Sequence, residues 1–426
     1  MSKSQSIPPL IKRNTLLLSV NQAFLTLVSQ MLITFGALIM MRMTGEIALA
    51  GLATSIAWGG RLIIVYQSGS WMDKVGRLKI LKLGLILTAL GSIILAFSVL
   101  TNSLPGFIIG IIASGLGWGA TQQSRVAVAD MYPSKRRGEG VGYLLTASVV
   151  GSIAATPFIA ASTMAGDALG IDSYAAVWFI TLGFIPFEFL ALKYVRPDPK
   201  DIAQNITKYY PEEPIDALRS KSLNNTVRST REYLAFYPIL AAFVVSALAQ
   251  GNMTMMMALT SLVLSEHNVH LTLISLSITI HVIGMYGLSA PLGKLSDKLG
   301  RRKLLIIAAL TSAIGSFLTP LTSDYGIITL GIFLVGIGWS AATVAATALI
   351  SDVTHPSERG RIMGSNDFFL SLASLTFPAL GSVIVSLLGF EKLGIFGFLV
   401  SIPAIAVAIN LKEPEPGVFR YSFRKK

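Results

Sequence analysis

The chain has 426 residues, of which 53% are apolar and 13% are charged, and its mean hydropathy is +0.66. This composition excludes an ordinary soluble domain and is typical of a protein that folds in a lipid bilayer. The absence of cysteine excludes disulfides, thiolate metal sites and cysteine nucleophiles.

Long apolar stretches follow one another along almost the whole chain. A transmembrane helix needs roughly 20 predominantly apolar residues, and about twelve such stretches are separated by short polar breaks. The predicted spans are residues 15–41, 47–71, 78–100, 104–129, 141–164, 174–195, 236–264, 271–293, 303–321, 326–350, 363–388 and 393–411. The sequence therefore predicts an all-α, multi-pass membrane protein.

A net charge of +12 could indicate a protein that binds nucleic acid. The positions of the basic residues along the chain indicate a membrane topology instead. Lys and Arg gather in the N-terminus, the even-numbered loops, the central linker and the C-terminal tail, whereas the opposite loops hold Arg42 and Lys392. By the positive-inside rule we expect both termini and the linker in the cytoplasm of a cell (inner or plasma) membrane. The charge then sets topology and attracts anionic lipid, and we expect no nucleic-acid partner. No cleavable signal peptide is expected, because residues 1–9 are polar and the first apolar run is long enough to span.

A long polar stretch with several prolines divides the chain into two halves. We predict a bundle over residues 1–195, a cytoplasmic linker over 196–233, and a second bundle with a short basic tail over 234–426. Six positions of one loop recur in the second half at an offset of 224: Gly69, Asp73, Lys74, Gly76, Arg77 and Lys79 match Gly293, Asp297, Lys298, Gly300, Arg301 and Lys303. A second pair follows, in which GLGWGA from Gly115 matches GIGWSA from Gly336, and Asp130 matches Asp352. Such half-against-half repeats are how secondary transporters are built.

The repeated loop carries a family resemblance. GSWMDKVGRLK from Gly69 and GKLSDKLGRRK from Gly293 resemble the signature loop between helices two and three of the major facilitator superfamily, although Trp71 and Met72 depart from the usual residues. The resemblance covers essentially the whole chain. It implies two pseudo-symmetric six-helix bundles and transport by alternating access, driven by a proton or ion gradient, with no cofactor and no enzyme activity.

The same resemblance implies a gating motif built on this loop. Its ion-pairing residues are Asp73, Arg77 and Asp130 in the first half and Asp297, Arg301 and Asp352 in the second, and Gly69, Lys74, Gly76, Gly293, Lys298 and Gly300 complete it. Such pairs bias two conformational states against each other by a few kcal/mol. The alternative is that these charges only fix the topology at a turn.

Five ionisable side chains lie inside the predicted spans, where each costs roughly 2.5–3.5 kcal/mol to insert. They are Arg61, Arg125, Glu188, His281 and Asp367. Arg61 is a candidate for binding an anionic substrate or for a switchable ion pair, with a static pair as the alternative, because it lies roughly 18 Å from the cytoplasmic edge. Asp367 is the candidate proton carrier. In the family's fold helices two and eleven are neighbours, so these two side chains are also candidates to pair.

The other ionisable groups have simpler interpretations. His281 is either a hydrogen-bonded filler or a proton relay, since imidazole titrates near neutral pH. Arg125 and Glu188 are also candidates for substrate binding or proton coupling, and the favoured alternative is that each is an interior ion-pair partner. The four histidines are dispersed, so no metal site is expected.

In the family's fold, spans one, four, seven and ten line a central cavity. Here they offer Asn21, Gln22, Gln30, Gln122, Gln123, Gln250 and Asn252, together with Trp118, Trp339 and Met253, Met255, Met256 and Met257. A Met-rich wall suits varied apolar ligands, and the alternative is that Met and Trp contact lipid or other helices. The glycines of spans four and ten favour close helix contacts over phosphate binding, and no Walker sequence follows them.

Comparison with the sequence signatures of two subfamilies, the drug/proton antiporters and the sugar porters, reduces the number of substrate classes to consider. Span five keeps Pro157 but lacks the Gly-Pro pair of drug/proton antiporters, and the linker from Val195 lacks the sugar-porter signature. We expect proton-linked export of hydrophobic or amphipathic small molecules by a monomer in a lipid bilayer. Uptake of an organic anion or metabolite by proton symport, with sugar less favoured, is the alternative, and a channel or receptor on the same fold is the rival class.

Overall fold

The computed structural model describes residues 7–133, 136–211, 233–354 and 356–413, without the side chains of residues 66, 69, 70, 73, 137, 138 and 356–361. All regular elements in these ranges are helical. The chain forms two compact units. Unit 1 is made of Met1–Gly45, Ile56–Lys221 and Leu271–Thr279, and unit 2 of Glu46–Ser55, Ser222–His270 and Ile280–Lys426.

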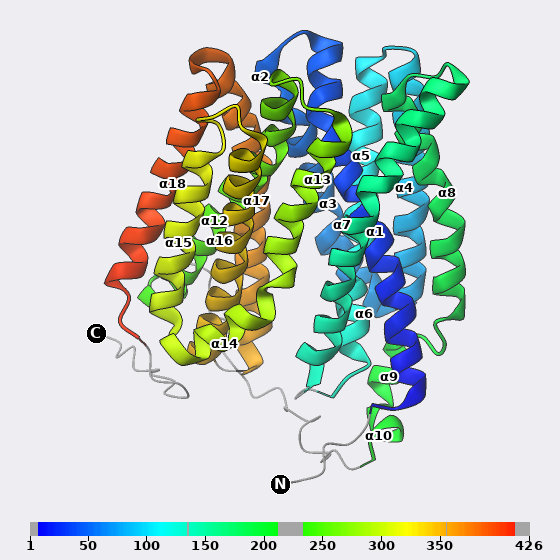
Figure 1. The fold of residues 1–426 in the computed structure, drawn as a ribbon. Helices are drawn as coiled ribbons and strands as arrows, with labels where there is room; N and C mark the ends of the chain where they lie inside the picture. Colours follow the sequence, from blue (N-terminus) through cyan, green and yellow to red (C-terminus); the bar gives the residue numbers. More distant parts are fainter. Residues whose placement is uncertain (1–6, 134–135, 212–232, 355, 414–426) are drawn as a thin grey trace. The chain divides into compact units, whose positions relative to one another are not determined.

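Unit 1 consists mainly of long helices from the first half of the sequence (Figure 1). They are α1 (Pro9–Thr44), most of α3 (Leu52–Val75), α4 (Arg77–Leu100), α5 (Leu104–Thr121), α6 (Ser124–Asp130), α7 (Arg137–Leu169) and α8 (Ser173–Tyr194), followed by the short α9 (Pro199–Gln204) and α10 (Ile206–Tyr209). Polar caps begin three of these helices, since Ser103 accepts from the amide of Gly106, Asp172 from that of Tyr174 and Asp198 from that of Lys200.

Unit 2 holds the corresponding helices of the second half. They are α12 (Tyr237–Glu266), the end of α13 (Leu271–Val282), the π-helical η3 (Ile283–Gly287), α14 (Ser289–Leu299), α15 (Arg301–Leu318), α16 (Tyr325–Val353), α17 (Pro356–Leu388) and α18 (Phe390–Asn410). The short α2 (Ile47–Ala50) packs on α17. Asp324 caps α16 by accepting from the amide of Ile327.

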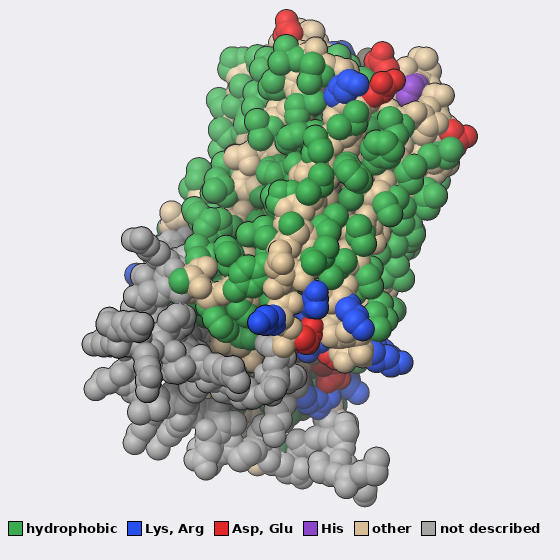
Figure 2. All heavy atoms as spheres, turned by 90° about the vertical axis from the view of Figure 1, so that its left-hand side faces the viewer, with side chains coloured by type: hydrophobic (Ala, Val, Ile, Leu, Met, Phe, Trp, Pro, Cys, Tyr) green, Lys and Arg blue, Asp and Glu red, His purple; other side chains and the backbone are tan. Residues whose placement is uncertain are grey.

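The helices are long and apolar enough to form membrane spans. Ten described helices meet this condition, and the pair Leu271–Gly287 and Ser289–Leu299, bent by 43°, raises the number to 11. The expected ninth span corresponds to α15, which has only 18 residues and begins with Arg301, Arg302 and Lys303. Figure 2 shows hydrophobic side chains along the flank, most of the Lys and Arg near one end together with some Asp or Glu, and Asp, Glu, a His and fewer Lys or Arg near the other.

Glycines allow the same close helix contact in each unit. In unit 1, a Cβ on Gly91 of α4 would lie 2.7 Å from the backbone nitrogen of Ser114 on α5. In unit 2, a Cβ on Gly315 of α15 would lie 2.5 Å from the carbonyl oxygen of Gly331 on α16. Gly91 and Gly315 share the offset of 224 found for the repeated loop. The repeat therefore extends from the loop to the packing of the helix that follows it.

The beginning of the predicted linker packs as part of unit 1. Val195, Ile202 and Ile206 belong to a buried apolar cluster together with Tyr132 and Tyr210. Burial, followed by the neighbouring Tyr132, raises the pKa of the Tyr210 phenol to about 12, so this side chain stays neutral at physiological pH. These apolar contacts were not predicted, because residues 196–233 are mainly polar in composition.

Candidate functional site

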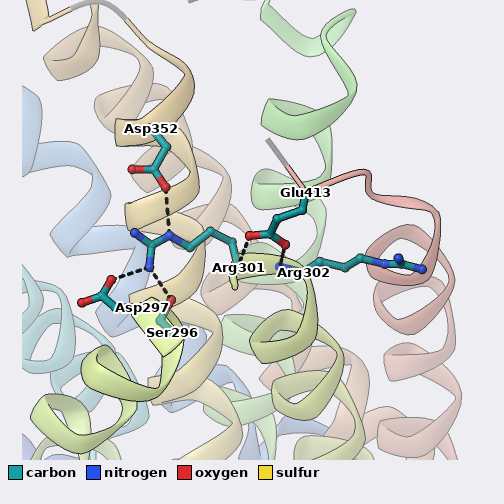
Figure 3. A network of polar contacts seen from close by, with 6 residues as sticks. All are labelled: Ser296, Asp297, Arg301, Arg302, Asp352 and Glu413. Carbon is teal, nitrogen blue, oxygen red and sulfur yellow. Dashed lines mark hydrogen bonds and ion pairs between the residues drawn. The ribbon is translucent and has the colours of Figure 1, made fainter. Parts of the chain in front are cut away.

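Arg301 lies at the centre of an ion-pair network in the second copy of the repeated loop (Figure 3). Its Nη1 donates to Asp297 Oδ1 at 2.6 Å and to Ser296 Oγ at 2.9 Å. Its Nε donates to Asp352 Oδ2 at 2.8 Å, which ties the start of α15 to the end of α16. The structure therefore brings together the three residues that the family resemblance grouped in this half.

The first copy repeats one arm of this network. Arg77 Nε donates to Asp130 Oδ2 at 2.7 Å, and both side chains are largely buried. Asp73 and Gly69 lie on α3, but their surroundings fall outside the described part of the chain. Lys74 and Lys298 are exposed, and a Cβ on Gly293 would make only ordinary contact with Val344.

A carboxylate that the sequence reasoning missed caps the helix after each loop. In unit 2, Glu413 accepts from the amides of Arg301 at 2.6 Å and Arg302 at 2.9 Å. In unit 1, Asp198 accepts from the amides of Arg77 and Leu78, each at 3.0 Å. A negative charge at a helix N-terminus is stabilising because the first amides are unpaired and the helix dipole is positive there.

The two loop glycines make room for these caps. Gly76 and Gly300 have φ values of +100° and +90°, which favour glycine. A Cβ on Gly76 would lie 2.9 Å from Asp198 Oδ2, and one on Gly300 would lie 2.8 Å from Glu413 Oε1. One sequence signal could have revealed the caps, because an acid followed by proline stands just after the last span of each half, in Asp198-Pro199 and Glu413-Pro414.

Arg61 lies against two tryptophans in unit 1. Its guanidinium carbon is 4.3 Å from the ring centroid of Trp58, on the same helix, and 5.2 Å from that of Trp118 on α5. The two indoles meet edge to face at 4.8 Å. Arg61 and Trp118 are only partly buried. This cluster presents a cation and aromatic surface together, which suits an amphipathic ligand.

Two glycines of α5 allow this helix to approach α3 closely beside the cluster. A Cβ on Gly115 would lie 2.3 Å from the carbonyl oxygen of Ala57, and one on Gly119 would lie 3.0 Å from that of Arg61. The glycines of the fourth span thus permit close contact of α5 with α3, in agreement with the interpretation from sequence.

A two-residue turn at Gln122 and Gln123 separates α5 from α6, but both residues keep right-handed helical backbone angles and Leu104–Asp130 forms one span. Gln123 Nε2 donates to the carbonyl oxygen of Val65 and to Ser68 Oγ on α3. Gln122 Oε1 and Arg125 Nε are buried without hydrogen-bond partners among the described residues.

Glu188 on α8 is almost fully buried, with 2% of the residue exposed. Its Oε2 accepts from Asn21 Nδ2 of α1 at 2.9 Å. Gln22, the residue after Asn21, accepts from Ser124 and donates to Ser148.

Within the described residues neither Glu188 nor Arg125 forms an ion pair. Their interpretation as interior ion-pair partners is wrong for this structure, because neither has an opposite charge within reach.

Gln30 is also an interior residue of unit 1 and is 1% exposed. Its Nε2 donates to Ser275 and Thr279 in the part of α13 that belongs to this unit, and its Oε1 accepts from Ser152 on α7. The hydroxyl of Thr156 bridges the same two residues of α13. Gln30 is therefore engaged in helix packing.

Several unit 2 candidates serve packing too. His281 is fully buried, with Nδ1 2.6 Å from the carbonyl oxygen of Ile332. Asn252 donates to Ser312 and Ser316, and Gln250 joins Trp339 to Ser374. The residues of the expected Met-rich wall, Met253, Met255, Met256 and Met257, are between 0% and 7% exposed. These side chains are buried in this structure, and Met255 lies against Gly381 of α17; ligand contact by the Met-rich wall stays a prediction.

Asp367 differs from these residues because it is exposed on α17. Its pairing with Arg61 stays a prediction. Within the described residues no group of three His, Asp or Glu side chains could hold a metal ion.

Comparisons with known proteins agree with this architecture. The Major Facilitator Superfamily model matches residues 18–250 and 240–424. The riboflavin transporter RfnT of Brucella anthropi is 24% identical over 94% of this chain and 96% of its own, and the multidrug resistance protein MdtG of Escherichia coli is 26% identical over 82% and 81%. The inward-open structure of the xylose transporter XylE from E. coli shares the fold, with a TM-score of 0.72, 17% identity and coverage of 95% and 97%. This chain is a multi-pass membrane transporter and belongs to the major facilitator superfamily.

Proposed function

We propose that this transporter exports hydrophobic or amphipathic small molecules across the cell membrane in exchange for protons. The observation that carries the proposal is the cluster of Arg61, Trp58 and Trp118 in unit 1. Two indoles give a polarisable surface for varied apolar ligands, and the guanidinium of the partly buried Arg61 can orient a polar or negative end. The name of the relative MdtG, a multidrug resistance protein, supports export of such compounds.

A second candidate function uses the same cluster differently. If the negative group of the ligand supplies most of the binding energy at Arg61, the transporter is an organic-anion carrier. The name of the relative RfnT, a riboflavin transporter, fits a planar aromatic substrate. The two candidates differ in whether a planar cation is carried as well as a planar anion.

We also propose that the protein works as a monomer with both termini and the linker in the cytoplasm. The support is the distribution of Lys and Arg over the sequence and at one end of the flank in Figure 2. No cofactor is needed under this proposal, because the proton gradient supplies the energy.

The test is transport in proteoliposomes that contain a pH-sensitive dye. Ethidium serves as planar cation, fluorescein as planar anion and xylose as sugar, each with and without an imposed pH gradient. We expect gradient-driven movement of ethidium, with or without fluorescein, and a matching opposite flow of protons. An ionophore that collapses the gradient serves as control.

Three results would contradict the proposal. Movement of fluorescein alone would favour the organic-anion function. Movement of xylose alone would favour a sugar carrier. Substrate movement that leaves the internal pH unchanged would exclude proton coupling.

A further inference from the structure

Glu188 is the one carboxyl group that the described structure buries inside a bundle without any positive partner. The residue is 2% exposed, and its single hydrogen bond is the 2.9 Å bond from Asn21 Nδ2. An ionised carboxylate in an apolar interior costs several kcal/mol unless it is paired, whereas a protonated carboxyl is neutral. The surroundings of Glu188 therefore favour the protonated form.

Asn21 supplies a second and independent observation. This residue is fully buried, and its Oδ1 has no hydrogen-bond donor among the described residues. An ionised Glu188 can only accept hydrogen bonds, whereas a protonated Glu188 brings one O–H donor into the same place. A proton on Glu188 thus provides the kind of group that the orphaned oxygen of Asn21 lacks.

The charges on the neighbouring helices do not compensate Glu188. Helices α1, α4 and α7 pack against α8. Their described ionisable side chains, with those of α8 and the nearby α6, are Lys12, Arg13, Arg42, Arg77, Lys79, Lys82, Arg125, Asp130, Glu139, Tyr143, Asp167, Tyr174, Lys193 and Tyr194. Arg42 pairs with Asp172 and Arg77 with Asp130. Glu188 has no hydrogen bond or ion pair with any residue of this set.

We infer that Glu188 is the proton-binding site of the transport cycle, with Asn21 as the residue that positions its carboxyl group. The inference rests on the proposed proton coupling. The carboxylate takes up one proton from water when a conformational change hydrates it, is carried neutral in the buried state described here, and returns the proton to water on the other side of the cycle. No bond other than the O–H bond forms or breaks.

The other acidic and imidazole candidates fit this role less well. Asp367 is exposed on α17 and does not share the buried setting of Glu188. His281 is fully buried with Nδ1 at the carbonyl oxygen of Ile332, and its Nε2 has no hydrogen-bond partner among the described residues, so a second proton would leave a buried cation without an acceptor. Sequence reasoning ranked Asp367 first because depth along a helix was the only available guide.

The test compares Glu188→Gln with the wild-type protein. Glutamine keeps an oxygen that can accept from Asn21, so the fold is expected to survive, which the melting temperature checks. Infrared spectroscopy at neutral pH should show the carbonyl band of a protonated carboxyl in the wild type, and this band should be lost in Glu188→Gln. Glu391→Gln, at an exposed position of α18, is the matched control and should keep the band.

Transport gives the second measurement. We expect Glu188→Gln to lose proton flow by at least about tenfold, while substrate-for-substrate exchange without a gradient continues, and Glu188→Asp to restore part of the flow. A wild-type band that persists in Glu188→Gln, or unchanged proton flow, would overturn the assignment to Glu188. Absence of proton flow in the wild type would instead overturn the proposed function, and the infrared band would still decide whether Glu188 is protonated.

Discussion

Single residues decide what the binding cluster can recognise. Arg61 and Trp118 are partly exposed, whereas Trp58 is 8% exposed and mainly supports the other two. The guanidinium lies close enough to both indoles for cation–π attraction. This attraction holds the cation in place and leaves the rest of the aromatic surface for a ligand.

Replacing Trp118 with alanine should weaken the binding of an aromatic substrate by about 3- to 30-fold, since a cation–π or stacking contact is worth about 0.5–2 kcal/mol. Trp118→Phe should lose less, because it keeps a ring. The dissociation constant of the substrate found in the proteoliposome assay is the measurement. Trp71→Ala is the matched control, because Trp71 is 40% exposed on α3. An equal loss of affinity in the control would argue against a specific role for Trp118.

At the scale of elements, glycine contacts set how closely neighbouring helices approach. Gly91 meets backbone atoms of α5, whereas a Cβ on Gly183 of α8 would meet nothing within 4 Å. In an open helix position, alanine is more stable than glycine by about 0.5–1 kcal/mol. The same substitution should therefore have opposite effects at the two positions.

We predict that Gly91→Ala lowers the thermal unfolding temperature by several degrees, because the backbone of α5 must move, and that Gly183→Ala leaves it equal or higher. Thermal unfolding of both variants in the same detergent measures the difference. Equal destabilisation by the two substitutions would contradict the assigned role of the α4–α5 contact.

The sequence predicts the local features of the helices but not the contacts between helices that are distant in the chain. Span positions and the repeated loop follow from hydropathy and spacing, which are local properties. The cap by Glu413 and the isolation of Glu188 depend on residues that are distant in the chain. Glu188 was therefore assigned a positive partner, because a buried acid usually has one, and only the packing of α1 against α8 reveals an amide in that place.

At the scale of the whole molecule, the ion-pair networks of the two units are expected to control the change between conformational states. In unit 2, the side chains of Arg301 and Asp352 are 17% and 20% exposed, whereas that of Asp297 is 71% exposed. Water screens the more exposed pair, so its contribution is smaller. The two acids should therefore differ in their effect on gating.

We expect Asp352→Asn to change the transport rate by about 2- to 10-fold and Asp297→Asn to change it less. The natural absence of cysteine allows a second measurement, the alkylation rate of a single cysteine introduced at the buried Ser340. A larger effect of Asp297→Asn, or no effect of either variant, would show that these pairs only stabilise the loop.

The two capping acids have a consequence for the history of the chain. Asp198 stands at the start of the connection between the halves and Glu413 at the start of the tail, yet both hold the N-terminus of an equivalent helix. A six-helix ancestor that carried its own acidic extension would produce this arrangement by duplication and fusion.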